Sequence, residues 1–138
     1  MIKTILIYCT LFAVWSQSVQ AQRLKQHYYD NGNLRAEGIV LDNGLEHGLW
    51  TRYFENGKIE IEISYKAGVK HGPFISYFES GQIESMGAYR DGKLEGPLIF
   101  LHESSQKVES MGKAANGHPF GEWDLYDEAG NRLKTVTH

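Results

Sequence analysis

Cysteine is nearly absent from this chain of 138 residues. The single cysteine, Cys9, lies in an apolar segment near the N-terminus, ahead of a predicted cleavage site after Ala21. The chain that remains after cleavage therefore forms no disulfide and offers no thiol nucleophile or cysteine metal ligand. Its fold must depend on side-chain packing and hydrogen bonds.

An excess of positive charge is also missing. The sequence contains 14 Lys and Arg against 17 Asp and Glu, so its formal net charge is -3. Proteins that bind nucleic acid mainly through its phosphates need a basic surface, and we therefore expect no nucleic-acid partner. The hydrophobic share of 41% is too high for a disordered chain, and the length suits one domain.

No apolar run reaches membrane-spanning length. The longest, residues 4–15, is shorter than the roughly 20 residues that a helix needs to cross a bilayer. Lys3 precedes this run, and Val19 and Ala21 place small residues where signal peptides are cleaved. This order predicts a secretory signal peptide over residues 1–21 and an exported mature domain over residues 22–138, periplasmic or extracellular. An uncleaved N-terminal anchor and a buried first helix are the alternatives.

Glycine, by contrast, is abundant, with 15 residues against 3 prolines, and its positions are periodic. The segment YFENG at 53–57 returns as YFESG at 77–81, which is the self-similarity expected of a repeat protein. Two glycine columns follow the same spacing: Gly44, Gly68, Gly92 and Gly117, and then Gly48, Gly72, Gly96 and Gly121. The predicted repeats cover residues 28–52, 53–76, 77–100 and 101–125, with a partial repeat over 126–138.

Each repeat reads as two strands and two turns. Asn56-Gly57 lies between two β-rich runs and predicts a tight hairpin turn, with positive φ at Gly57 and at its equivalents Gly32 and Gly81. The connection with two glycines predicts a longer, looser turn. We therefore expect an all-β fold, an elongated antiparallel meander of about ten strands built from tandem β-hairpin repeats. Its first strands place Trp50, Phe74, Leu98 and Trp123 on one face, and Tyr53, Tyr77, Leu101 and Tyr126 on the other.

One repeat carries the pattern of a known family almost in full. The segment YFENG at 53–57, an apolar strand, Gly68, Gly72 and the following Phe74 resemble a MORN repeat in its bacterial variant form. The resemblance covers residues 28 to about 133. It implies hairpin repeats and a protein-interaction scaffold, with phospholipid binding in some MORN proteins. Bacterial proteins built mainly from this variant are grouped as YwqK-type toxin–antitoxin antitoxin-like proteins, and this chain is similar to them.

The fourth repeat departs from the pattern. Ser105 replaces the turn glycine, His102 replaces the second aromatic residue, and one residue is inserted near Gln106 and Lys107. We therefore expect a wider loop there. Export also departs from the cytoplasmic setting of an antitoxin.

Two columns of ionisable residues are candidates for chemistry. His47 and His71 occupy equivalent positions about two strands apart, too far for easy convergence on one zinc ion. His102 and His118 are isolated in sequence. The second column is acidic and has one member beside each predicted tight turn: Asp30, Glu55, Glu79, Glu103 and Glu128. These carboxylates either face solvent at the turns or form an acidic rim that contacts a partner. Unlike environments are needed for acid–base catalysis, so five equivalent carboxylates favour structural roles.

Motifs for a catalytic nucleophile, a phosphate loop or a zinc helix are absent from the sequence. We therefore expect no catalytic, cofactor-binding or metal-binding residues, no cofactor and no enzymatic activity, with a small hydrolase as the remaining enzyme hypothesis. The sequence predicts an exported protein-binding module, with antitoxin- or immunity-like activity as the finer hypothesis and a structural scaffold of the cell envelope as the alternative. The expected partner is another protein, bound along the broad face at Arg52, Lys58 and Glu79. The chain itself is expected to be a monomer or to self-associate weakly through its sheet edges.

The predicted cleavage has a direct test. N-terminal sequencing of the protein recovered outside the cytoplasm should begin at Gln22, within a residue or two, because cleavage follows the small residue Ala21. Recovery of a cytosolic protein that still begins at Met1 would contradict it.

Overall fold

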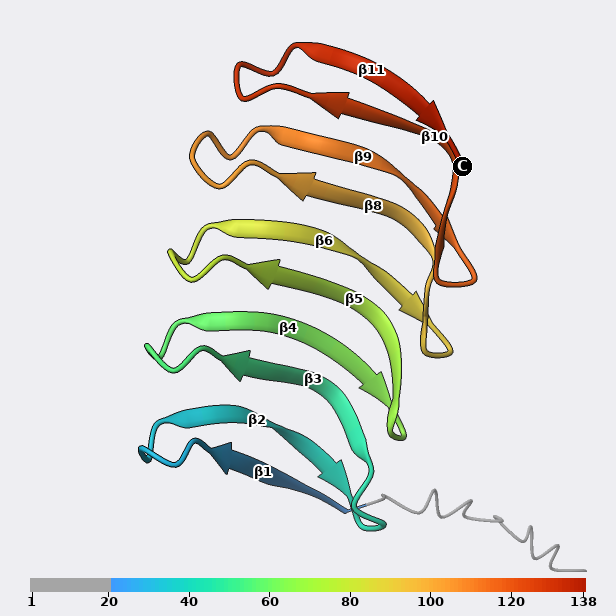
Figure 1. Cartoon of the computed structure of the whole chain (residues 1–138). Helices are drawn as coiled ribbons and strands as arrows, with labels where there is room; N and C mark the ends of the chain where they lie inside the picture. Colours follow the sequence, from blue (N-terminus) through green and yellow to red (C-terminus); the bar gives the residue numbers. More distant parts are fainter. Residues whose placement is uncertain (1–20) are drawn as a thin grey trace, which may run out of the picture.

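The computed structural model describes residues 21–138, which form eleven β-strands and contain no helix. The predicted signal peptide lies outside these residues, apart from Ala21. In Figure 1 the strands form a stack of hairpins, each lying on the one before. The strands are β1 (Gln22–Tyr28), β2 (Leu34–Leu41), β3 (Glu46–Tyr53), β4 (Ile59–Lys66), β5 (Val69–Tyr77), β6 (Ile83–Arg90), β7 (Lys93–Leu94), β8 (Gly96–Leu101), β9 (Val108–Ala115), β10 (His118–Tyr126) and β11 (Arg132–Thr137).

All strands belong to one open antiparallel sheet. Strands that follow one another in sequence are also neighbours in the sheet, from β1 through β6 and then from β8 to β11. The two-residue β7 pairs with β6 and accounts for the eleventh strand, because the chain leaves the ladder at Glu95 before it continues as β8. The predicted all-β meander is therefore confirmed.

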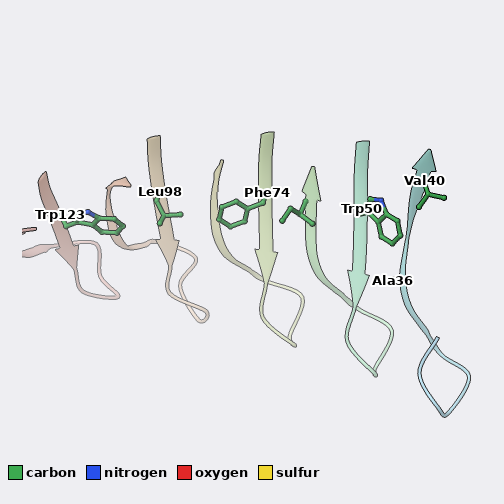
Figure 2. Packing of buried hydrophobic residues seen from close by; sticks show 7 residues of the cluster. Ala36, Val40, Trp50, Phe74, Leu98 and Trp123 are labelled. Atoms are coloured by element: carbon green, nitrogen blue, oxygen red, sulfur yellow. The ribbon is translucent and has the colours of Figure 1, made fainter. Parts of the chain in front are cut away.

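One face of this sheet, here named the core face, carries the buried apolar residues. Trp50, Ile63, Phe74, Leu98 and Trp123 are each at most 7% exposed. Figure 2 shows the side chains of Trp50, Phe74, Leu98 and Trp123 in a row along the sheet. Strand register explains the row, because Trp50 pairs with Ile63 and Ile63 in turn pairs with Phe74. Burying each large side chain contributes roughly 1.5–3 kcal/mol. The predicted placement of Trp50, Phe74, Leu98 and Trp123 on one face is confirmed.

Glycines on the core face let the tryptophans cross between hairpins. A Cβ atom added to Gly38 would overlap the indole ring of Trp50, and one added to Gly112 would overlap the ring of Trp123. Each indole N–H then donates to the carbonyl of the residue after that glycine: Trp50 Nε1 to Ile39 O at 3.0 Å, and Trp123 Nε1 to Lys113 O at 3.1 Å. The same arrangement therefore joins the first hairpin to the second and the fourth to the fifth.

Three of the four connections with two glycines are tighter than the sequence predicts, whereas the first closes a five-residue loop in which Leu41 N donates to Leu45 O at 2.9 Å. Lys66 pairs with Val69, so Ala67 and Gly68 alone form the turn, with φ angles of 49° and 83°. Positive φ at both positions is typical of the two-residue hairpin turn that matches strand twist. The equivalent turns are Asp91-Gly92 and Asn116-Gly117. The prediction of a looser turn is therefore wrong at these three connections and right at the first, where residues 42–44 form a wider loop. The second glycine of each pair, such as Gly72, lies within or at the start of a strand.

The Asn-Gly segments, in turn, form wider loops than predicted. Phe54 N donates to Lys58 O at 2.8 Å and Gly57 N donates to Phe54 O at 2.9 Å, which closes a loop of five residues. A bulge between Arg52 and Tyr53 shifts the register and adds the extra length. Positive φ at Gly32, Gly57 and Gly81 is nevertheless confirmed. These wide loops form one border of the sheet, at the left of Figure 1, and are named the loop rim.

The fourth loop is wider still, as predicted. His102 N donates to Lys107 O at 2.9 Å, which encloses one residue more than the five-residue loops. Gln106 takes the positive φ angle, 54°, that glycine takes in the other loops. The insertion therefore enlarges the loop without changing the pairing of β8 with β9.

β1 and β11 are the two edges of the sheet, as predicted. All seven residues of β1 are exposed, and β11 is exposed except for Val136. Gly38 pairs with Lys25 of β1 on one side and with Trp50 of β3 on the other. Lys25 therefore occupies the position in the first hairpin that Trp50 occupies in the second. Charged side chains on an edge strand discourage pairing with another chain.

The contact between Trp123 and Gly112 can be tested by its effect on stability. Gly112→Ala should lower the free energy of unfolding by roughly 1–3 kcal/mol, because the new methyl group overlaps the indole ring. Chemical denaturation measures the change. In the double variant Gly112→Ala/Trp123→Leu, the two effects should be less than additive, since the ring that clashes is gone. Fully additive effects would contradict the contact.

Candidate functional site

Arg52 lies on the core face, at the mouth of a pocket of about 260 Å³. Its register partners are Ala36 and Ile61, both part of or packed against the apolar core. The pocket is lined by His27, Arg35, Glu46, Trp50, Arg52 and Tyr65, together with core side chains. Two guanidinium groups and one carboxylate therefore give this pocket a positive balance at the N-terminal end of the sheet.

Lys58 and Glu79 lie elsewhere, in neighbouring loops of the loop rim. Lys58 Nζ donates to Ser80 O at 2.7 Å, and Asn56 Nδ2 donates to Glu79 O at 3.4 Å. The three residues predicted to contact a partner are therefore divided: two are together on the rim, and Arg52 is on the core face. Lys58 also has a structural role, because its ammonium group ties one loop to the next.

The whole loop rim is joined in this way. Asn33 Nδ2 donates to Glu55 O at 2.8 Å, and Lys107 Nζ donates to Ala129 O at 2.7 Å. Gln106 holds the backbone of Ile83 with two hydrogen bonds of 3.1 Å. The acidic column lies on this rim, and its members are exposed. Side-chain bonds to the backbone of the adjacent loop therefore link successive repeats along the rim.

The column that begins with His47 has a structural role. His47 Nδ1 accepts a hydrogen bond from Ala67 N at 3.4 Å, and Glu95 Oε2 accepts one from Asn116 N at 3.1 Å. His71 does the same for Asp91 N at 3.4 Å. All three donors are the positive-φ residues of two-residue turns. Within residues 21–138, no group of three or more His, Cys, Asp or Glu side chains is placed to hold a metal ion.

The face opposite the core, named the far face, carries a row whose polarity changes along the sheet. Strand register sets its order as Glu37, Thr51, Glu62, Ile75, Met86, Ile99, Met111 and Asp124. The fourth to seventh residues of this order, Ile75 to Met111, form the apolar row. Among the described residues, no second layer of chain lies over this face, and Met111 is 39% exposed.

The apolar row borders a groove of about 530 Å³. Pro97, Ile99, Met111 and Phe120 provide its apolar walls, and Phe120 is 61% exposed. Lys113 and the carboxylates of Glu122 and Asp124 also line the groove. Sequence reasoning missed this surface, although one signal was present: the repeat position of Glu37 and Glu62 is occupied by methionine in the third and fourth repeats.

Tyrosine–glutamate pairs occupy the polar end of the far face. Tyr53 donates its hydroxyl hydrogen to Glu37 Oε1 at 2.8 Å, and Tyr77 donates to Glu62 Oε2 at 2.7 Å. The bond to Glu62, aided by partial burial, raises the pKa of Tyr77 to about 12. Burial and the bond to Glu37 raise the pKa of Tyr53, while hydrogen bonds from Gln26 and Tyr53 lower the pKa of Glu37. The predicted location of these tyrosines opposite the core is confirmed.

Comparison with known families identifies the repeats. The sequence profile of the family described as MORN repeat variant matches residues 24–41, 46–67 and 70–91. The three matched segments correspond to the hairpins of β1 with β2, β3 with β4 and β5 with β6, so the chain contains three matched MORN repeat variants. The later hairpins, β8 with β9 and β10 with β11, continue the same sheet. No curated protein matches the chain.

MORN repeats are generally protein- or membrane-binding modules, which agrees with the surfaces described above. The structure contains no helix within residues 21–138 of the length and apolar character needed to cross a bilayer.

The bond between Tyr77 and Glu62 makes a pH-dependent prediction. The native state holds the Tyr77 proton more tightly than the unfolded chain, whose tyrosine pKa is about 10. Its contribution to stability should therefore be complete below about pH 10 and be lost as the pH rises through about 12. Ultraviolet titration of phenolate absorbance measures the pKa. Glu62→Gln should lower it, and Tyr77→Phe should remove this step from the titration; an unchanged curve in both variants would contradict the assignment.

Proposed function

We propose that this protein is an exported, non-enzymatic repeat protein that binds another protein through the apolar row of its far face. One observation carries the proposal: Ile75, Met86, Ile99 and Met111 are consecutive register partners on a face that no other described part of the chain covers. Contiguous apolar surface of this kind, bordered by polar residues, is typical of protein-interaction sites.

The repeat architecture supports the proposal. Consecutive repeats present equivalent side chains at regular intervals along the sheet, which suits an extended partner surface. The core face, by contrast, uses its large side chains to join the hairpins. A partner on the far face can therefore be bound without disrupting the packing of Trp50 or Trp123.

The finer hypothesis is that the bound partner is a toxin, neutralised outside the cytoplasm in an antitoxin- or immunity-like manner. This activity requires one principal partner and a fixed stoichiometry. A structural scaffold of the cell envelope would instead hold several envelope components at once and inhibit none of them.

Affinity purification of the exported protein with mass spectrometry tests the binding surface. Ile99→Asp/Met111→Asp should weaken recovery of the partner at least tenfold, because charged groups would have to be buried at the centre of the interface. The matched variant Arg52→Glu/Lys58→Glu/Glu79→Lys changes the surface predicted from the sequence and leaves the apolar row intact. Circular dichroism of both variants checks that each is folded before binding is compared.

The outcomes separate the two surfaces. Loss of the partner only in the Ile99/Met111 variant supports the far face. Loss only in the Arg52/Lys58/Glu79 variant would show that binding uses the core face and the loop rim, and the far-face proposal would be wrong. A single partner whose toxicity disappears on binding supports neutralisation, whereas several envelope proteins support the scaffold.

A further inference from the structure

Aromatic rings recur at one position of the second strand in the second, third and fifth hairpins, whereas the first hairpin has Val40 there, opposite Arg23. Tyr65 pairs with Gly48, and Tyr89 pairs with Gly72. His138 follows the same rule at the end of the chain, because its backbone and that of Gly121 exchange two hydrogen bonds. The position is therefore defined by the glycine opposite it, and it is named the ring position.

Each ring at this position packs against the large first-strand residue of its own hairpin. The ring centroids of Trp50 and Tyr65 are 6.4 Å apart, at an interplanar angle of 71°. Trp123 and His138 are 6.2 Å apart at 83°. Phe74 and Tyr89 are closer, at 5.2 Å. Edge-to-face and tilted pairs at these distances are favourable for aromatic rings.

The fourth hairpin lacks its ring. Ala114 pairs with Gly96 and so occupies the ring position, and the first-strand residue beside it is Leu98 rather than an aromatic residue. A hollow of about 370 Å³ lies at this place, and Ala114 and Leu98 both line it. The other hollows on the core face and far face have mixed polar walls, whereas the wall of this one is almost wholly apolar.

The surroundings of the hollow suit a planar ring. Leu94, Phe100, Pro119 and Trp123 contribute its other apolar walls. The side chains of His118 and His138 also line it, almost wholly through their carbon atoms. Sites for small ligands are lined predominantly by apolar side chains, and their volumes begin at roughly 300 Å³.

We propose that this hollow is a binding site for a single phenol ring, which takes the place that Tyr65 and Tyr89 occupy in the neighbouring repeats. The ring lies against Leu98 and Trp123. This site lies on the core face and is separate from the apolar row, so it does not depend on the proposed function.

Titration of the exported protein with p-cresol, followed by two-dimensional NMR, tests the site. Saturable shifts should occur at the amide of Ala114 and at the indole N–H of Trp123. The indole N–H of Trp50, at the other end of the same face, is the internal control and should not move. Cyclohexanol has a similar size and a hydroxyl group but no aromatic ring, and it should bind at least tenfold more weakly.

A larger side chain at position 114, which would fill the hollow, provides the most direct test. Ala114→Tyr should raise the melting temperature and abolish the p-cresol shifts, because the new side chain occupies the site. If this variant does not fold, Leu98→Phe/Ala114→Tyr reproduces the Phe74–Tyr89 pair and serves the same purpose. Ala115→Tyr, whose side chain is on the opposite face of the strand, is the matched control and should retain binding.

Three results would overturn the proposal. The first is the absence of saturable shifts up to the solubility limit of p-cresol. The second is equal binding of cyclohexanol, which would show a general apolar hollow rather than a ring site. The third is unchanged binding by the folded Ala114→Tyr variant, which would place the ligand elsewhere.

Discussion

The indole ring of a tryptophan lying over a glycine of the preceding hairpin is the contact on which the array depends. Trp50 covers Gly38 and donates its N–H to Ile39 O, and Trp123 repeats the arrangement over Gly112. An isolated hairpin is at best marginally stable in water. Packing between consecutive hairpins therefore provides the stability that no single repeat has, and the small residue beneath the ring is what lets the strands carry so large a side chain.

The core face holds the repeats together, and its central column from Trp50 to Trp123 is apolar throughout. The far face, by contrast, changes in polarity from repeat to repeat. The position filled by Glu37 and Glu62 becomes Met86 and Met111, and the tyrosine that bonds to the carboxylate becomes Leu101 beside Met86. Acceptor and donor are therefore both lost at Met86 and Leu101, whereas at Met111 only the acceptor is lost, because the tyrosine position is still filled by Tyr126. The result is a sheet with one uniform backbone whose exposed face changes from polar to apolar along its length.

The two edge strands of the array carry charged residues. Lys25 stands where the following hairpin has Trp50, and Lys134 pairs with Leu125 from the side opposite Ser110. A charged side chain at these positions cannot take part in a further apolar layer without being buried at high cost. Repeat arrays need polar end units for this reason, and both edges of this sheet carry them.

The sequence by itself determined the all-β repeat architecture, the buried column from Trp50 to Trp123 and the positive φ of Gly57, because periodic spacing and residue type act locally. It misassigned the two kinds of turn, since a bulge at Arg52 and Tyr53 shifts the register, and the length of a turn depends on pairing across both strands. Only the tertiary structure brought Met86, Ile99 and Met111 into one row and separated Arg52 from Lys58 and Glu79. The physical reason is that strand register, which no single segment specifies, decides which side chains share a face and which of them remain exposed.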